Sequence, residues 1–237
     1  MKHIFFFFLF IAFSIFSRAQ KVVNDENAEV RPITSFHAIH VSNSFDVIIT
    51  QGGEESLAVS ASNKEDLPAI KTTVEKGVLK IWFDQKNSWW PKNRKLKAYI
   101  SVKNINELKG SGAADIEIEG TLQATDLKLN FSGASDLDGK IVTTNKLDIH
   151  LSGASDVSIS GSASEVEIDA SGASVVKAFD FKTNNCVVDA SGASKVRITV
   201  EKELSASLSG ASKVQYKGGA LIRNIKTSGA SSISRES

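Results

Sequence analysis

The chain contains seven copies of one tetrapeptide that begins with serine, and regularly spaced serines could take part in catalysis or in ligand binding. Six read Ser-Gly-Ala-Ser, at 132–135, 152–155, 171–174, 191–194, 209–212 and 228–231, and a Ser-Gly-Ala-Ala variant stands at 111–114. A serine nucleophile needs the Gly-x-Ser-x-Gly turn with a placed histidine and acid, and a phosphate-binding loop needs a lysine and a following helix. The repeat supplies neither set, so we expect it to have a structural role.

The other candidates for catalysis are carboxylates. Asp136, Asp138, Asp156 and the nearby Glu117 form the one cluster in which two acids could act on a glycosidic bond. Their spacing follows from strand alternation alone, and no arginine or lysine stands among them. We therefore predict no catalytic residues, and a carbohydrate-active enzyme is the less favoured alternative.

The histidines do not indicate a metal site. His37 and His40 are three residues apart and would point to opposite faces of a strand, while His150 stands alone beside Asp148. Neither the number nor the spacing of these side chains meets the requirements of a bound metal ion. We expect no metal and no cofactor.

A short insertion at 87–95 places paired tryptophans among cations. Trp89, Trp90, Lys92 and Arg94 are candidate ligand-binding residues, because exposed indole rings offer flat surfaces to sugar rings or to an apolar patch of a protein. The alternative is that the indoles fold back and cover the side or the end of the fold.

The charges that follow successive repeats change sign along the chain. Asp115 and Glu117, Asp136 and Asp138, and then Asp156 follow the early repeats, whereas Lys177, Lys195, Arg197 and Lys213 follow the later ones. Such a gradient could orient a head-to-tail or an antiparallel partner, since separated fields steer association. The alternative is drift on a solvated surface, where single charges contribute little.

The spacing of the repeats indicates the elements that position these residues. Their glycines are Gly112, Gly133, Gly153, Gly172, Gly192, Gly210 and Gly229, so the period is about 20 residues, as in solenoids. On both sides of each repeat, apolar and polar residues alternate with a period of two, which is typical of strands. We predict an all-β fold, a parallel β-helix with coils of about 20 residues and Ser-Gly-Ala-Ser corners. Glycine suits a corner with positive φ, and the serine hydroxyls can bond nearby backbone groups.

The same alternation, without the tetrapeptide, occupies the first half of the chain. We expect residues 34–237 to form a single β-helix domain, in which 34–103 make irregular wider coils and 104–237 make the regular ones. Residues 20–33 are expected to be an exposed leader. Residues 1–19 combine a basic start, an apolar run too short to span a bilayer and small residues at the cleavage positions, so they are predicted to be a signal peptide. An uncleaved membrane anchor is the alternative.

Composition excludes some function classes. Without Lys2 and Arg18 the 28 basic residues fall to 26, against 27 acidic ones, which argues against binding of nucleic acid or polybasic contact with a membrane. The single cysteine, Cys186, permits no internal disulfide. We predict an exported protein with no transmembrane segment after signal cleavage.

The order of FDVIITQG at 45–52, a Lys-Gly-Val-Leu-Lys-Ile strand at 76–81 and the serial Ser-Gly-Ala-Ser corners resembles a known family. It is similar to the putative auto-transporter adhesin head domain, also called the GIN domain, over roughly residues 34–237. The resemblance implies a right-handed β-helix on the cell envelope and carries no established catalytic residues.

These observations predict a non-enzymatic exported domain for adhesion, or for interaction with a glycan or a protein. A periplasmic structural protein without an external ligand remains open, and the chain could lie at the cell surface, at the outer membrane or in the periplasm. After 228–231 the sequence shows no cap over the last coil. A homo-oligomer through the β-helix end, another protein, or the final residues folded across could cover it.

Overall fold

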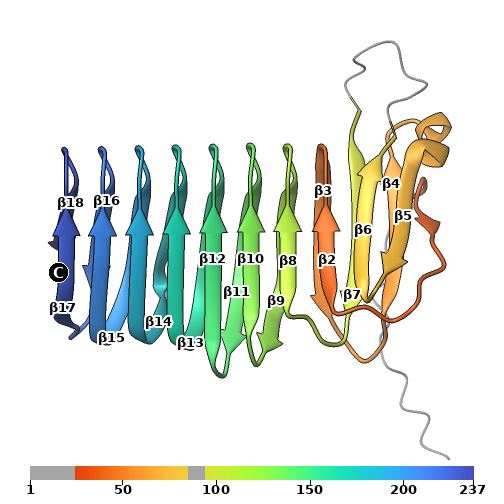
Figure 1. Cartoon of the computed structure of the whole chain (residues 1–237). Coiled ribbons are helices and arrows are strands. Elements are labelled where there is room, and N and C mark those ends of the chain that lie inside the picture. The colour runs from red at the N-terminus through yellow and green to blue at the C-terminus, as the bar shows by residue number, and fades with distance from the viewer. Residues whose placement is uncertain (1–24, 85–93) are drawn as a thin grey trace, which may run out of the picture.

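The computed structural model describes residues 25–84 and 94–237, and these form a β-solenoid of about six turns with coils of roughly 20 residues (Figure 1). The fold class predicted from the repeats is therefore confirmed. The expected signal peptide lies outside the described residues, as do Trp89, Trp90 and Lys92. Among the residues that the structure describes, no helix has the length and apolar character needed to cross a membrane.

Each regular coil consists of one strand before a corner and one strand after it. Separate strands before the corners are β8 (Glu107–Gly110), β10 (Leu127–Phe131), β12 (Lys146–Leu151) and β17 (Leu221–Thr227). Separate strands after them are β9 (Asp115–Ala124), β11 (Asp136–Thr143), β16 (Lys213–Lys217) and β18 (Ser232–Arg235). Three long strands run from one corner to the next: β13 (Asp156–Ala170), β14 (Val175–Ala190) and β15 (Lys195–Leu208).

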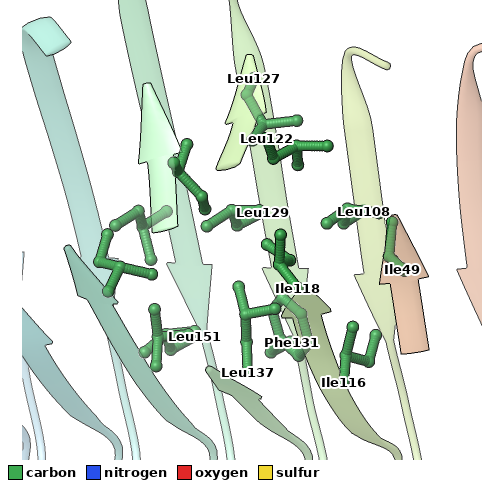
Figure 2. Packing of buried hydrophobic residues seen from close by; sticks show 14 of the residues in the cluster. Ile49, Leu108, Ile116, Ile118, Leu122, Leu127, Leu129, Phe131, Leu137 and Leu151 are labelled. Carbon is green, nitrogen blue, oxygen red and sulfur yellow. The ribbon is translucent and has the colours of Figure 1, made fainter. Parts of the chain in front are cut away.

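Parallel pairing places each apolar residue next to its counterpart in the adjacent coil. Leu129 pairs with Leu108 on one side and with Ile149 on the other. Ile116 likewise pairs with Leu137. These side chains are at most 1% exposed, and Figure 2 shows Leu108, Leu129, Ile116 and Leu137 within the apolar interior. Because a fully buried aliphatic side chain contributes about 1.5–3 kcal/mol, this interior accounts for much of the stability of the solenoid.

The corners repeat one geometry. All seven glycines of the tetrapeptides have φ between 70° and 83°. From Gly133 onward, a Cβ on each of these glycines would lie no further than 2.7 Å from the carbonyl oxygen of the preceding one. The alanine amide after each of these glycines donates a hydrogen bond of 2.7 Å to that same carbonyl. Glycine is therefore required both by the backbone conformation and by the close stacking of the corners.

The last serine of the tetrapeptide closes the corner. Ser174 is 0% exposed, and its Oγ donates a 2.6 Å hydrogen bond to the carbonyl oxygen of Ser171. Equivalent bonds, three residues back along the chain, occur in the other Ser-Gly-Ala-Ser copies. The hydroxyl thus has a structural partner in every copy, as the structural reading of the repeat expects.

The first half of the chain does not form the simple series of wider coils that the sequence predicted. Its elements are β1 (Glu29–Val30), β2 (Ala38–Val41), β3 (Phe45–Gln51), β4 (Ser56–Ala61), the 3-10 helix η1 (Lys64–Ala69), β5 (Ile70–Glu75), β6 (Val78–Phe83) and β7 (Leu96–Val102). β2 pairs in parallel with both β6 and β8, and β3 with both β7 and β9. The β2–β3 coil therefore lies between the β6–β7 coil and the regular series, and chain order is not stacking order (Figure 1).

Antiparallel strands close this end of the stack. β5 pairs with β6 in a hairpin whose turn residues, Lys76 and Gly77, both have positive φ, as hairpin turns require. β4 pairs antiparallel with β7, and β1 pairs with β4. Glu29 and Val30, in the segment expected to be an exposed leader, thus form an outer strand along β4, and both side chains are exposed. Since parallel and antiparallel strands share the period of two, the sequence pattern could not distinguish this layer from further coils.

Two polar residues that the sequence analysis did not single out hold the β2–β3 coil in place. Asn43, at φ 74°, occupies the corner where later coils have glycine, and its Oδ1 accepts a hydrogen bond from the amide of Phe83. Asparagine tolerates this conformation better than most residues, and this is the signal that could have revealed the corner. The side chain of Gln51 bonds both the amide and the carbonyl of Gln123, and also the carbonyl of Lys103. Gln51 therefore links the β2–β3 coil to Lys103, directly after β7, and to Gln123 of β9.

Candidate functional site

The outward residues of the strands that follow the corners share one surface of the solenoid, which we call the ladder face. Its first column, read along the stack, contains Asp46, Asp115, Asp136, Asp156, Val175, Lys195, Lys213 and Ser232. Its second column contains Ile48, Glu117, Asp138, Ser158, Lys177, Arg197, Gln215 and Ser234. In each column the acids lie in one half and the cations in the other, together with uncharged residues in both halves. Beyond Asp46, the acidic end of the first column adjoins Lys97 of β7.

Strand alternation and register position these side chains. Ile116 and Leu137, which follow Asp115 and Asp136 in the chain, are fully buried or nearly so, which directs the acids outward. A slip of one residue would bury the acids, so the apolar interior maintains the register. The stacked corners begin every strand at the same level, and the columns are straight for this reason.

In the acidic half of the ladder face, carboxylates on adjacent strands lie close together and repel one another. Partial desolvation, followed by the charges of Asp136 and Asp46, raises the pKa of the Asp115 carboxyl, with smaller effects from Glu117 and Asp138. Like charges on directly adjacent strands repel each other. Asp46 belongs to β3, so only the stacking order of the fold brings it beside Asp115.

The two halves meet between β13 and β14. There the Nζ of Lys177 lies 2.9 Å from Oδ2 of Asp156, an ion pair in which both side chains are more than a third exposed. Further along the basic half, the Nε of Arg197 donates a 3.2 Å hydrogen bond to Oε1 of Gln215. These partners orient two of the cations, while exposure to water keeps their charges available to a partner molecule.

A shallow hollow of about 500 Å³ lies over this boundary, along the second column. Asp138, Ser158, Lys177 and Arg197, one residue from each of four successive coils, contribute to its lining. Phe179 also lines the hollow, and the Nζ of Lys217 stands 5.1 Å from the centroid of the Phe179 ring. The hollow forms where the pairing of β13 with β14, and of β14 with β15, shifts register.

The opposite face, formed by the strands before the corners, carries a different ion-pair network. Nζ of Lys146 lies 2.7 Å from carboxylate oxygens of both Asp148 and Glu167. Hydrogen bonds to these carboxylates raise the pKa of Lys146, and the bond to Lys146 lowers the pKa of Glu167. His150 lies 3.8 Å from Asp169. Within residues 25–84 and 94–237, no group of three or more histidine, cysteine, aspartate or glutamate side chains could hold a metal ion.

Three of the four predicted ligand-binding residues, Trp89, Trp90 and Lys92, lie outside the part of the chain that the structure describes. Of the four, only Arg94 belongs to the described residues, and it is bound to the fold. Its Nε lies 3.2 Å from Oδ1 of Asp66, and its guanidinium stands 5.1 Å from the centroid of the Phe83 ring. Arg94 thus joins the end of the β5–β6 hairpin to η1, and a ligand-binding role for the tryptophans stays a prediction.

At the other end of the described stack, β17 and β18 form the last coil (Figure 1). Leu221 is 64% and Ile222 is 43% exposed there. An oligomer through this end, the contact predicted from the sequence, would bury both side chains, and it also stays a prediction.

The class of this protein is that of the parallel β-solenoids. Antiparallel strands cover one end of this solenoid, and one of its faces carries acids and cations in separate halves. The family model described as putative auto-transporter adhesin, head GIN domain, matches residues 35–220, so the chain belongs to this family. The resemblance seen in the sequence is confirmed.

Several solved structures share the fold. A putative adhesin from Bacteroides fragilis NCTC 9343 is 21% identical with a TM-score of 0.81, and the match covers 90% of this chain and 98% of that one. A putative lipid binding protein from Parabacteroides distasonis ATCC 8503 is 19% identical with a TM-score of 0.68, covering 90% and 98%. A putative adhesin from Parabacteroides merdae ATCC 43184 is 17% identical with a TM-score of 0.69, covering 89% and 96%. No curated protein matches the chain.

Proposed function

We propose that this chain is an exported, non-enzymatic interaction domain that makes adhesive contacts with a macromolecule through its ladder face. The observation that carries the proposal is the separation of the acids from the cations along the two columns of this one sheet face. A surface of this kind presents two oriented fields to a partner, which favours specific docking. The family description and the names of two of the solved neighbours agree with a role in adhesion.

The arrangement of the carboxylates favours binding over glycoside hydrolysis. In that reaction two carboxyl groups flank the bond that is cleaved. Asp115, Asp136 and Asp156 stand in one column, on adjacent parallel strands, and point out of the sheet in the same direction. A sugar placed on this column would meet all three acids from one side, so none could act from the opposite face of the ring.

Export is part of the proposal and follows from the predicted signal peptide together with the family. Its test is the exposure of the protein on intact source cells. A protease or an impermeant label applied from outside should modify the protein while a periplasmic control protein is spared. If the protein is shielded like the control, adhesion at the cell surface is wrong, and its partners must be sought inside the envelope.

The role of the ladder face is tested by binding of the purified protein to arrays of glycans and matrix proteins. Reversal of two cations, Lys195→Glu with Arg197→Glu, should abolish any binding that wild type shows. The matched control is Lys109→Glu with Lys128→Glu, which makes the same change in net charge on the opposite face, where both lysines are exposed. Equal loss in both variants would mean that net charge alone, not the ladder face, governs the contact.

A further inference from the structure

We infer that the ladder face binds a second copy of this chain in antiparallel orientation, so that the acidic half of each copy lies against the basic half of the other. The inference rests on the proposed function, because it names the partner of the same face. It comes from a symmetry in the positions of the charges along the stack.

Among the eight residues of the first column, from Asp46 to Ser232, the midpoint lies between Asp156 and Val175. Lys97 of β7 lies beyond Asp46, outside the part of the row that has a symmetric counterpart. Asp136 and Lys195 lie at equal distances from this midpoint, one strand beyond the central pair. Asp115 and Lys213 lie at equal distances one strand further out. A twofold rotation about an axis parallel to the strands, through this midpoint, therefore places Asp136 opposite Lys195 and Asp115 opposite Lys213 of the second copy.

The second column obeys the same symmetry. Its midpoint lies between Ser158 and Lys177, and Asp138 and Arg197 lie one strand beyond this pair on either side. Because the axis is parallel to the strands, each column of one copy faces the same column of the other. Asp138 then faces Arg197 of the second copy, and Glu117 faces Gln215.

Other face-to-face orientations are unfavourable. With the two stacks parallel, the acidic half of one copy would lie against the acidic half of the other, and the basic halves would likewise meet. Partial desolvation, together with repulsion from Asp136 and Asp46, already raises the pKa of Asp115 within one copy, and a second set of acids would add to this repulsion. Charge complementarity thus selects the antiparallel arrangement.

The hollow described above lies at the position of the twofold axis. Its lining includes Asp138 and Arg197, which are symmetric about the midpoint, and Ser158 and Lys177 beside it. In the antiparallel pair the hollows of the two copies would face each other and leave space for water. Hydrated ion pairs avoid much of the desolvation cost that fully buried pairs incur.

The size of the face predicts a weak dimer. Seven inter-strand steps of about 4.8 Å, and strands of about five residues, give a face of roughly 34 by 16 Å, so the two copies would bury about 1,100 Å² in total. This area is at the low end for specific interfaces and is typical of transient ones. Because the contacts are between charges close to solvent, we expect strong dependence on ionic strength.

Sedimentation velocity of the purified exported protein tests the inference. We expect a concentration-dependent dimer at about 20 mM salt that dissociates at about 500 mM, where screening is nearly complete. Two variants should each be monomeric at low salt: Asp136→Lys with Asp138→Lys, and Lys195→Asp with Arg197→Asp. Mixed in equal amounts, they should form a heterodimer, and all four substitutions in one chain should restore the homodimer. Recovery in the mixture would also show that both variants are folded.

Two control variants separate this contact from others. Lys109→Glu with Lys128→Glu alters the opposite face, and Leu221→Lys with Ile222→Lys alters the exposed end of the stack, so both should dimerise like wild type. If the end variant is monomeric while the ladder-face variants still dimerise, association runs through the end and the inference is wrong.

The failure of this inference can be distinguished from failure of the proposed function. A protein that stays monomeric at low salt, but whose binding to a glycan or matrix protein is lost in Lys195→Glu with Arg197→Glu, retains the proposed function and overturns the self-association. A protein that neither dimerises at low salt nor binds any glycan or matrix protein overturns both the inference and the proposed function.

Discussion

The amide of Ala193 donates a 2.7 Å hydrogen bond to the carbonyl oxygen of Gly172 in the preceding coil, and this bond defines the contact between successive corners. A Cβ on the neighbouring Gly192 would lie 2.5 Å from the same oxygen. The close approach explains why glycine recurs at this position of the tetrapeptide. It also makes the corner a sensitive place for substitution.

We predict that Gly192→Ala lowers the free energy of unfolding by about 3 kcal/mol or more, since an L residue at this φ costs about 1–2 kcal/mol and overpacking costs about 1–3 kcal/mol in addition. The matched control is Gly120→Ala. Gly120 has a similar φ of 81°, but no atom lies within 4 Å of the position of its Cβ. Chemical denaturation of both variants should show a loss of only about 1–2 kcal/mol for the control. Equal losses would mean that the backbone conformation, not the stacking, requires glycine.

The buried hydroxyl of the corner should have a measurable effect of its own. Ser174→Ala removes the 2.6 Å hydrogen bond to the carbonyl of Ser171 and should cost about 1–2 kcal/mol. Ser207, which is exposed, provides a control, and Ser207→Ala should change the free energy of unfolding by less than about 0.5 kcal/mol. A Ser174→Ala variant as stable as wild type would show that the serine does not stabilise the corner.

Cys186 should behave as an inert thiol in the folded protein. It is 2% exposed, and burial raises the pKa of its thiol to about 12, so the reactive thiolate is scarce at neutral pH. A maleimide reagent at about pH 8 should label the native protein much more slowly than the protein unfolded in denaturant. Labelling of the native protein at the rate of the unfolded chain would contradict the packed interior around β14.

The acidic half of the ladder face should make stability depend on pH through Asp115. Its pKa in the folded state is raised above the ordinary value of 3.8, so the folded state binds this proton more tightly than the unfolded chain does. The free energy of unfolding should therefore decrease as the pH rises from 3.8 through the folded pKa. Asp115→Asn removes this penalty and should be more stable than wild type at pH 7.

The same variant should have the opposite effect on self-association. Because Asp115 faces Lys213 of the second copy in the antiparallel dimer, Asp115→Asn should weaken the dimer at low salt while it stabilises the monomer. Thermal unfolding at pH 3 and pH 7, together with sedimentation, measures both effects. If wild type and variant have the same pH dependence, repulsion along the acidic column is not significant.

Much of the solenoid could be predicted from the sequence, because its determinants are local. The alternation of apolar and polar residues around Leu129 and Ile149 specifies strands, and the spacing of the glycines specifies the length of a coil. Since every coil begins at the same corner, the sequence also predicted that Asp136 and Asp156, and later Lys195 and Lys213, would align on one flank.

The position of the β2–β3 coil was decided only by the tertiary structure. A strand pattern states which residues face inward but not which strand lies alongside, so nothing local in 45–51 indicates that β3 pairs with both β7 and β9. This pairing brings Asp46 beside Asp115 and completes the acidic column. The hollow over Ser158 and Lys177 likewise depends on register shifts between neighbouring coils. The strands and the corner of a single coil can therefore be predicted from the sequence. Contacts between segments far apart in the chain depend on how the coils stack.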